Sequence, residues 1–360
     1  MGLAAFGRAD PVLVNALCQL LEVDRGRLRF AEAEEIARIR CLLEPYKRRA
    51  GAPVMEAADL AATAQVAYSV LADRVLASTL DEASGNLILT GGCALNSSYN
   101  GTLIGRGEID QLFVPPCPAD DGNAIGAALL AWMKETGETD IPFGGGSPFL
   151  GSRAKDGALA VCRQAVQGSL SVTETRGDTA GLVAQRLAKG QILGVMRGRA
   201  EFGPRALGNR SIIADPRGAA TKERLNRLVK GREPFRPFAP VVAESDMAEW
   251  FEKTPISPYM AMALPFASQA KTRVHAVVHE DGTGRAQSVS DRIYPWMSEL
   301  LRAFGRETGV PVLLNTSFNI MGKPILHDVQ DAVAMLMTSG LDGVVIEDTL
   351  IEKGSSDHGL

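Results

Sequence analysis

Apolar residues recur along the chain in two patterns, one with the period of an α-helix and one as short continuous runs. In residues 59–76 the apolar side chains of Leu60, Ala67 and Leu71 share one helical face. The same spacing predicts helices at 12–23, from 94, and at 120–134, 179–189, 221–229, 293–304 and 329–338. Short apolar runs predict strands at 87–90, 112–114, 192–196, 274–279, 310–314 and 343–347. Because strands and helices alternate in both halves, the pattern predicts an α/β fold.

A change in composition near the middle of the chain predicts two domains. The segment Gly144–Ser152 is rich in glycine, proline and serine, as linkers are. A length of 360 residues also suits two domains. We therefore expect a first domain at 1–143, a linker at 144–171 and a second domain at 172–360.

The overall charge narrows the class of partner. The net charge is −4 and the pI about 5.7, which argues against nucleic acid or an anionic membrane as the main partner. The five cysteines are scattered without a CxxC pair, so neither a disulfide framework nor a zinc ribbon is indicated. No signal segment and no long apolar run is evident, so the sequence predicts a cytoplasmic protein.

Against this acidic background, two neighbouring segments concentrate arginine and lysine. They read EFGPRALGNRSIIADPR at 201–217 and KGREPFRPFAP at 230–240. Glycine lets a backbone approach a ligand closely, proline fixes a loop, and arginine pairs with phosphate or carboxylate oxygens in bidentate geometry. The alternative is a solvated charged turn, but Phe202, Leu207 and Ile212 interrupt the charges as in a packed segment. The pattern therefore predicts a local anion site.

Two strand-to-helix loops in the first half are further candidates. Gly91 and Gly92 follow a predicted strand, where bare backbone N–H groups and a helix N-terminus favour phosphate; tight packing is the alternative. Asp120 and Asp121 follow the next predicted strand. Asp120 is either the N-cap of the following helix or the ligand of a cation that neutralises a phosphate, and position alone does not decide.

Polar residues in the second half complete the candidates. His275 and His279 have HxxxH spacing on a predicted strand, but no obvious third ligand accompanies them, so a packed or anion-contacting His279 is favoured over a metal pair. Asn315 and Ser317 end a predicted buried strand, where side chains often face a ligand. The sequence has no Ser-His-Asp order, GxSxG or Walker A motif. A ring around a nucleotide or acyl phosphate is expected from Arg205, Lys230, Arg236, Arg285, Asn315 and Ser317.

Five motifs in this order resemble the NodU/CmcH family of ATP-dependent O-carbamoyltransferases, over nearly the whole chain. They are TGGCALN…PPCPADDGNAIGAAL, EFGPRALGNRSIIADPR, KGREPFRPFAP, DGTGRAQSV and VLLNTSFNIMGKPI. The resemblance implies part of a Kae1-like domain of the actin/Hsp70-type ATPase class, followed by a YrdC-like α/β domain. It also implies that carbamoyl phosphate and ATP give carbamoyl-adenylate at the YrdC-like site. The Kae1-like site, with a bound divalent metal (Mg²⁺ or Fe²⁺), then transfers the carbamoyl group to a hydroxyl of a small natural product.

By the same resemblance, individual residues acquire expected roles. The six residues of the predicted ring would hold carbamoyl phosphate and ATP. Asp120, the first aspartate of DxGxAxG, would be the metal ligand, and Asp10 would face the transfer pocket. Contacts to the nucleotide or adenylate are expected from Gly91, Gly92 and Asn96.

One departure from the family pattern shapes the expected function. The MGLAAFG motif lies about a third of the way along the family's sequences but at residues 1–7 here. The resemblance therefore predicts one half of a split carbamoyltransferase, whose partner protein supplies the first Kae1-like lobe and its histidine pair. Two alternatives stay open: a remodelled stand-alone adenylate-dependent transferase on a different acceptor, and a non-catalytic partner subunit of a full-length enzyme. The acidic charge disfavours a role in tRNA threonylcarbamoylation.

Overall fold

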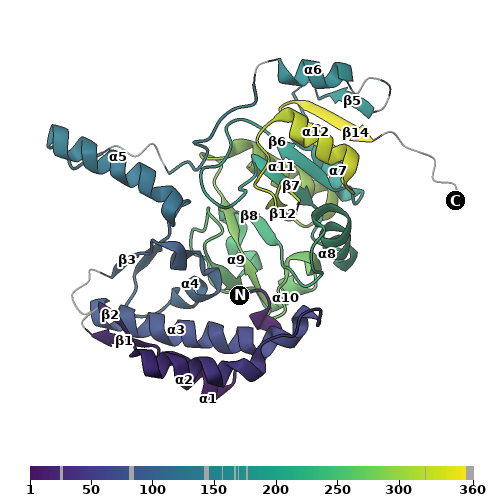
Figure 1. Cartoon of the computed structure of the whole chain (residues 1–360). Coiled ribbons are helices and arrows are strands. Elements are labelled where there is room, and N and C mark those ends of the chain that lie inside the picture. Colours follow the sequence, from purple (N-terminus) through teal and green to yellow (C-terminus); the bar gives the residue numbers. More distant parts are fainter. Residues whose placement is uncertain are drawn as a thin grey trace.

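The first half of the chain is mainly helical and carries two small sheets (Figure 1). The computed structural model describes residues 1–353 except 25–26, 81–84, 142–145, 156, 166–167, 169, 176 and 321. β1 pairs antiparallel with β2, and β3 pairs parallel with β4. The elements are α1 (Pro11–Cys18), β1 (Leu21–Asp24), β2 (Arg27–Phe30), α2 (Ala33–Leu43), α3 (Ala58–Leu80), β3 (Asn86–Ile88), α4 (Ser97–Leu103), β4 (Gln111–Phe113) and α5 (Asp120–Thr136).

The second half is built on an eight-stranded mixed sheet with the order β11-β8-β12-β7-β6-β13-β14-β5. Within it β11 is parallel to β8 and β13 to β6, and the other neighbours are antiparallel. Its strands are β5 (Leu170–Glu174), β6 (Leu193–Met196), β7 (Arg210–Ala214), β8 (Ala239–Ala243), β11 (Gln287–Val289), β12 (Val312–Ser317), β13 (Gly343–Ile346) and β14 (Thr349–Lys353). A separate hairpin pairs β9 (Ala263–Pro265) with β10 (Thr283–Arg285).

Helices cover both faces of this sheet, which makes three layers (Figure 1). Successive residues of a strand point to opposite faces, so Ile213 and Leu313 pack on one side while Ile212 and Leu314 pack on the other. The first side carries α7 (Thr179–Ala188) and α11 (Pro295–Thr308), and the second carries α6 (Ala158–Ala165) and α12 (Val329–Thr338). Because β6 and β13 are buried on both faces, these two strands are continuous runs of apolar residues and glycine, which is why the sequence revealed them. The remaining short helices are α8 (Ala219–Arg224), α9 (Met247–Trp250) and α10 (Ser268–Lys271).

The α/β class and most of the long helices are confirmed, whereas several boundaries are not. The helix expected at 12–23 ends at Cys18, because residues 21–24 pair with β2. The strand expected at 274–279 is wrong: His275–Val277 form a 3₁₀ turn that buries Ala276 and Val277. Within the linker expected at 144–171, residues 158–165 form the packed helix α6.

The two halves touch through α4 and β9. A Cβ atom on Gly101 of α4 would lie 1.9 Å from the Ala263 carbonyl oxygen of β9, so only glycine permits this approach. Asn100 Nδ2 donates to the Ala261 carbonyl at 2.9 Å, and Lys253 Nζ donates to the Ile104 carbonyl at 2.5 Å. These contacts hold the first half against the sheet hairpin of the second. Among the described helices none is long and apolar enough to cross a membrane.

Candidate functional site

Strand directions bring distant cationic segments to one end of the large sheet. Arg205 precedes β7, Arg236 precedes β8, and Arg285 ends β10 just before β11. Since β12 runs antiparallel to β7 and β8, and β8 runs parallel to β11, the starts of these strands lie beside the end of β12. The end of β12 carries Asn315 and Ser317, as expected. The arginines, however, come from the amino ends of their strands.

A cavity of about 540 Å³ lies at this end of the sheet, between the two halves of the chain. Its volume is typical of small-molecule sites. Five of the six residues predicted to ring a ligand line it, and the sixth, Lys230, does not. Lys222, Arg232 and His279 also line it, although the sequence analysis gave Lys222 and Arg232 no role. The ionisable side chains of the lining are Arg205, Lys222, Arg232, Glu233, Arg236, His279, Glu280, Asp281 and Arg285.

Three of these arginines, all half-buried, crowd together, and none of them forms an ion pair with a carboxylate in the described part of the chain. Burial and the positive charges of Arg205 and Arg232 lower the pKa of Arg285 to about 9. Burial, then Arg236, lowers the pKa of Arg232 to about 10, and burial lowers that of Arg205. The buried Arg285 Nε has no hydrogen-bond acceptor among the described residues. Like charges held together away from water are costly, so the cluster is suited to an anionic ligand that compensates them.

Arg232 and Arg236 differ in how firmly they are held. Arg232 Nε donates to Asn226 Oδ1 at 2.7 Å, and its guanidinium lies 4.8 Å from the centre of the Phe238 ring. Arg236 is exposed, and among the described residues its side chain forms a single long contact of 3.5 Å, from Nε to Glu233 Oε2. An exposed pair of this kind holds a side chain weakly. Arg232 is therefore the better-placed cation, although the motif reading singled out Arg236.

Lys230 supports the site rather than lining it. It ends the π-helical turn Leu225–Lys230 and is 2% exposed. Its Nζ contacts the Ser317 carbonyl at 2.7 Å, the Asn319 carbonyl at 2.8 Å and Asn319 Oδ1 at 2.5 Å. Burial, followed by the charges of Arg232 and Arg236, lowers its pKa to about 7. Lys230 thus fixes the turn that follows β12 and with it Ser317.

The loop that carries Arg205 is fixed by side-chain hydrogen bonds to its backbone. Glu201 Oε1 accepts from the N–H groups of Leu207 at 2.7 Å and Asn209 at 2.8 Å. Asn315 Nδ2 donates to the Ala206 carbonyl at 3.2 Å, and Gln287 Nε2 donates to the Leu207 carbonyl at 2.7 Å. Asn315 Oδ1 is buried and has no donor among the described residues. The loop is therefore preorganised, and one buried amide oxygen at its edge lacks a hydrogen-bond donor among the described residues.

Arg210, part of the predicted cationic loop, is instead a structural residue of β7. It is fully buried. Its guanidinium donates to the carbonyls of Arg197 and Asn209 at 2.8 Å and to those of Ser152 and Gly198 at 3.3 Å. The expectation that the whole segment 201–217 forms an anion-binding loop is thus wrong for its strand. Backbone hydrogen bonds of 2.8–2.9 Å also tie 148–152 to 200–202, so this part of the predicted linker is packed against the loop.

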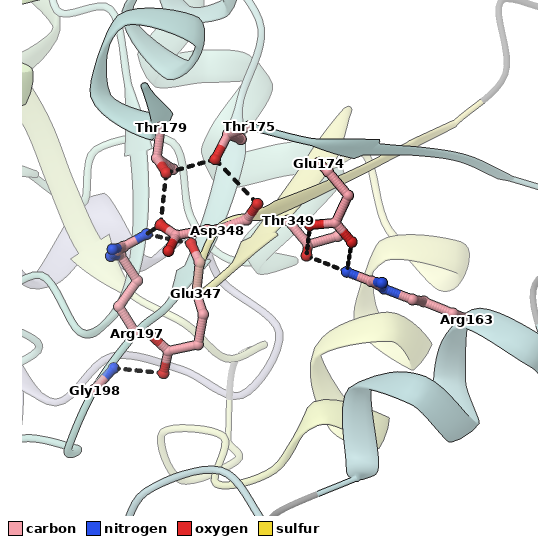
Figure 2. Close-up of polar contacts among 9 residues, drawn as sticks. All are labelled: Arg163, Glu174, Thr175, Thr179, Arg197, Gly198, Glu347, Asp348 and Thr349. Atoms are coloured by element: carbon pink, nitrogen blue, oxygen red, sulfur yellow. Dashed lines mark hydrogen bonds and ion pairs between the residues drawn. The ribbon is translucent and has the colours of Figure 1, made fainter. Parts of the chain in front are cut away.

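A polar network holds the start of the same loop (Figure 2). Thr179 Oγ1 donates to Asp348 Oδ1 at 2.7 Å, and Arg197 donates to the same oxygen at 3.1 Å. These contacts, the Thr179 hydrogen bond first, lower the pKa of Asp348. The Gly198 N–H donates to Glu347 Oε1 at 2.8 Å. The charged groups here are paired with one another, so the network anchors the loop and is not itself a ligand site.

Five predicted residues of the first half lie outside the cavity lining. Asp10 caps α1, since its Oδ1 accepts from the Val12 N–H at 2.8 Å. Asn96 caps α4 by accepting from the Tyr99 N–H at 3.2 Å, although its neighbours Ser97 and Ser98 line the cavity. The remaining three are Gly91, Gly92 and Asp120.

Gly91 and Gly92 occupy an open turn. Gly91 has a φ of +82° and its N–H donates to the Pro118 carbonyl at 2.6 Å. A Cβ atom on either glycine would meet nothing within 4 Å, so tight packing does not explain them.

Asp120 is exposed and is the first residue of α5, whose N-cap is Ala119. The N-cap alternative is therefore wrong. No group of three or more metal-binding side chains occurs among the described residues. His275 is exposed, and His279 Nδ1 lies 3.1 Å from Thr283 Oγ1. Burial lowers the pKa of His279 to about 4, as for a packed histidine.

Fold and site together define an α/β protein with a preorganised cationic cavity. Comparison of the sequence with protein families is more specific. Residues 1–129 match the carbamoyltransferase N-terminus and residues 184–353 the carbamoyltransferase C-terminus. The chain belongs to the carbamoyltransferase family of the NodU/CmcH type.

Individual relatives agree with this family. The nodulation protein NolNO of Sinorhizobium fredii is 41% identical over 320 residues, which are 85% of this chain and 46% of that protein. NolO of Bradyrhizobium diazoefficiens is 38% identical, over 85% of this chain and 57% of its own length. The 3'-hydroxymethylcephem-O-carbamoyltransferase of Amycolatopsis lactamdurans is 35% identical, over 74% of this chain and 49% of its own length. The chain thus spans about half the length of these relatives.

Comparison with solved structures gives only weak similarity. The crystal structure of full-length HypF in its phosphate- and nucleotide-bound form shares 16% identity with a TM-score of 0.31, over 52% of this chain and 22% of that one. At such a TM-score the likeness carries no structural argument.

Proposed function

We propose that the cavity forms carbamoyl-adenylate from carbamoyl phosphate and ATP, as the YrdC-like domain of a carbamoyltransferase. The observation that carries the proposal is the cluster of Arg205, Arg232 and Arg285, which are half-buried in one cavity and form no ion pair with a carboxylate among the described residues. Both substrates are phosphorylated, and such arginines bind phosphate oxygens in bidentate geometry. Membership of the carbamoyltransferase family supplies the reaction class.

The reaction balances with one water molecule. Water cleaves carbamoyl phosphate to carbamate and inorganic phosphate. A carbamate oxygen then attacks the α-phosphorus of ATP, forms carbamoyl-adenylate and displaces pyrophosphate. The protein contributes positioning and compensation of negative charge by arginines that are already in place. Asn315 Oδ1, which is buried and free of a donor, is suited to accept a hydrogen bond from the carbamoyl NH₂ group.

Transfer of the carbamoyl group to a small-molecule hydroxyl is proposed to need a second polypeptide that carries a further Kae1-like lobe. Two features of the first half support this. Helix α5 projects from the body, has no buried residue and exposes Leu130 (67%) and Trp132 (53%) (Figure 1). The parallel pair β3–β4 leaves Ile88 and Phe113 exposed, whereas parallel sheets are normally covered on both faces. A packed lobe would cover both surfaces and bring further ligands to a metal beside Asp120.

A stand-alone transferase is the second candidate, and one observation favours it. Met1, Leu3, Phe6 and Val54 help to line the cavity, so residues of the first half do close a pocket within this chain. These side chains are apolar, however, and offer no base or metal ligand for an acceptor hydroxyl. They complete the adenylation cavity better than they complete a transfer site.

The test is pyrophosphate release by the purified chain with MgATP and carbamoyl phosphate, without a partner. We expect release in the wild type and a loss of roughly a hundredfold or more in Arg205→Ala or Arg285→Ala, the scale seen when one charge-stabilising donor is removed. Arg302→Ala is the matched control, because that arginine is exposed and pairs with Asp291 away from the cavity. A folded wild type that binds ATP but releases no pyrophosphate would contradict the proposal.

A further inference from the structure

The cavity has two chemically different walls. Every ionisable side chain in its lining comes from residues 205–285. The lining contributed by residues 1–98 has apolar side chains, two serine hydroxyls and a glycine, and no charged side chain. A ligand that fills the cavity should therefore present an anionic part to the second half and an uncharged part to the first.

An aromatic pair joins the two walls, with Phe6 from the first half and Phe235 from the second. Phe6 and Phe235 lie with ring centres 5.9 Å apart and planes at 71°, and both are only partly buried. Phe235 belongs to the same short loop as Arg232 and Arg236. A Cβ atom on Gly2 would lie 3.3 Å from Pro237, so the first residues of the chain rest directly on this loop. The aromatic rings and the arginines thus line one continuous space.

We propose that Phe6 and Phe235 form the subsite for the nucleobase of the nucleotide whose phosphates the arginine cluster binds. The proposal rests on the adenylation function proposed above and adds which part of the chain recognises the base. A planar base is the uncharged part of a nucleotide, and it stacks favourably on aromatic side chains. Because one ring comes from residue 6 and the other from residue 235, the base would contact both halves of the chain at once.

The experiment separates base recognition from phosphate binding. ATP and inorganic tripolyphosphate are titrated into the full chain, each with Mg²⁺, by calorimetry. Phe6→Ala should raise the Kd for ATP by about five- to a hundredfold, the range expected when one base–aromatic stack is lost. It should leave the Kd for tripolyphosphate within about twofold, because tripolyphosphate has no base. Phe6→Leu keeps apolar volume without an aromatic face, so it should also weaken ATP binding while leaving tripolyphosphate binding unchanged. Phe6→Trp keeps an aromatic face and should bind ATP about as well as wild type.

Phe30→Ala is the matched control, because Phe30 is 80% exposed on β2 and does not line the cavity. Unchanged ATP affinity in both Phe6→Ala and Phe235→Ala, while Arg285→Ala loses ATP, would overturn the subsite. So would an equal loss of ATP and tripolyphosphate, since that effect would not concern the base. If the split is seen but the wild type releases no pyrophosphate, the subsite stands and the proposed reaction fails.

Discussion

Buried arginines have two different uses in this chain, and their partners distinguish them. Arg210 is surrounded by four backbone carbonyls, so its charge is distributed over hydrogen bonds within the fold. Arg205 and Arg285 are half-buried and line the same cavity, and among the described residues neither forms an ion pair with a carboxylate. Arg205 and Arg210 are five residues apart in one motif, and the sequence alone gave no reason to separate them. The difference depends on β7, whose pairing buries Arg210.

His279 provides a pH prediction at the scale of one side chain. Its pKa falls from about 6.5 to about 4 on folding, mainly because of burial, while Arg285 and Lys222 also oppose its protonation. At pH values between about 4 and about 6.5, His279 binds a proton in the unfolded chain but not in the folded chain. The free energy of unfolding should therefore fall by up to about 3 kcal/mol as pH decreases from 6.5 to 4.

His279→Gln should lose this part of the pH dependence, because glutamine does not titrate. The measurement is urea unfolding at several pH values between 4 and 7, compared with wild type. His275→Gln is the control, because its side chain is exposed. If the free energy of unfolding of His279→Gln depends on pH as steeply as that of wild type, another group is responsible for the pH dependence.

At the scale of elements, the apolar pattern predicted burial better than it predicted backbone conformation. The run at 274–279 does bury Ala276 and Val277, but in a 3₁₀ turn. Conversely, β7 begins with Arg210 and Ser211, two polar residues that the sheet buries, so no apolar run marked its start. Helices α7 and α12 were predicted well, because a helix needs only local spacing. Strands β7 and β14 each pair with the preceding strand on one side and with a strand distant in sequence, β12 or β5, on the other, and local spacing does not show the distant partner.

The contact between α4 and β9 gives a prediction at this scale. Gly101→Ala should destabilise the chain by about 1–3 kcal/mol, because the new Cβ would collide with the Ala263 carbonyl and force α4 away from β9. Urea unfolding measures this loss. The control is Gly126→Ala in the middle of α5, where a Cβ would meet nothing within 4 Å. That change should stabilise by up to about 1 kcal/mol through helix propensity. Equal stability of Gly101→Ala and wild type would contradict a tight contact between the halves.

At the scale of the whole molecule, the residues predicted from the second-half motifs mostly line one cavity, whereas those predicted from the first half do not. Arg205, Arg285 and Asn315 come from three distant segments, and the sheet brings them to one cavity as the resemblance implied. Asp10 and Asn96 cap helices outside this cavity, and a motif does not distinguish that role from ligand binding. Arg232 had a signal in KGREPFRPF, but its burial could be recognised only once Phe238 and Asn226 were placed around it.

The uncovered surface of the first half supplies the last prediction. Replacing both Leu130 and Trp132 with serine should change the free energy of unfolding by no more than about 0.5 kcal/mol, because α5 buries none of its residues in this chain. Pyrophosphate release should also be unchanged, since α5 does not line the cavity. In any preparation in which a second polypeptide restores carbamoyl transfer, the double variant should lose both carbamoyl transfer and co-elution with that polypeptide.

Val161→Ser on α6 is the control, because Val161 is 62% exposed on the other half of the molecule. Transfer that persists with the double variant would mean that the partner docks elsewhere. A large loss of stability would mean that α5 packs against its own chain in solution.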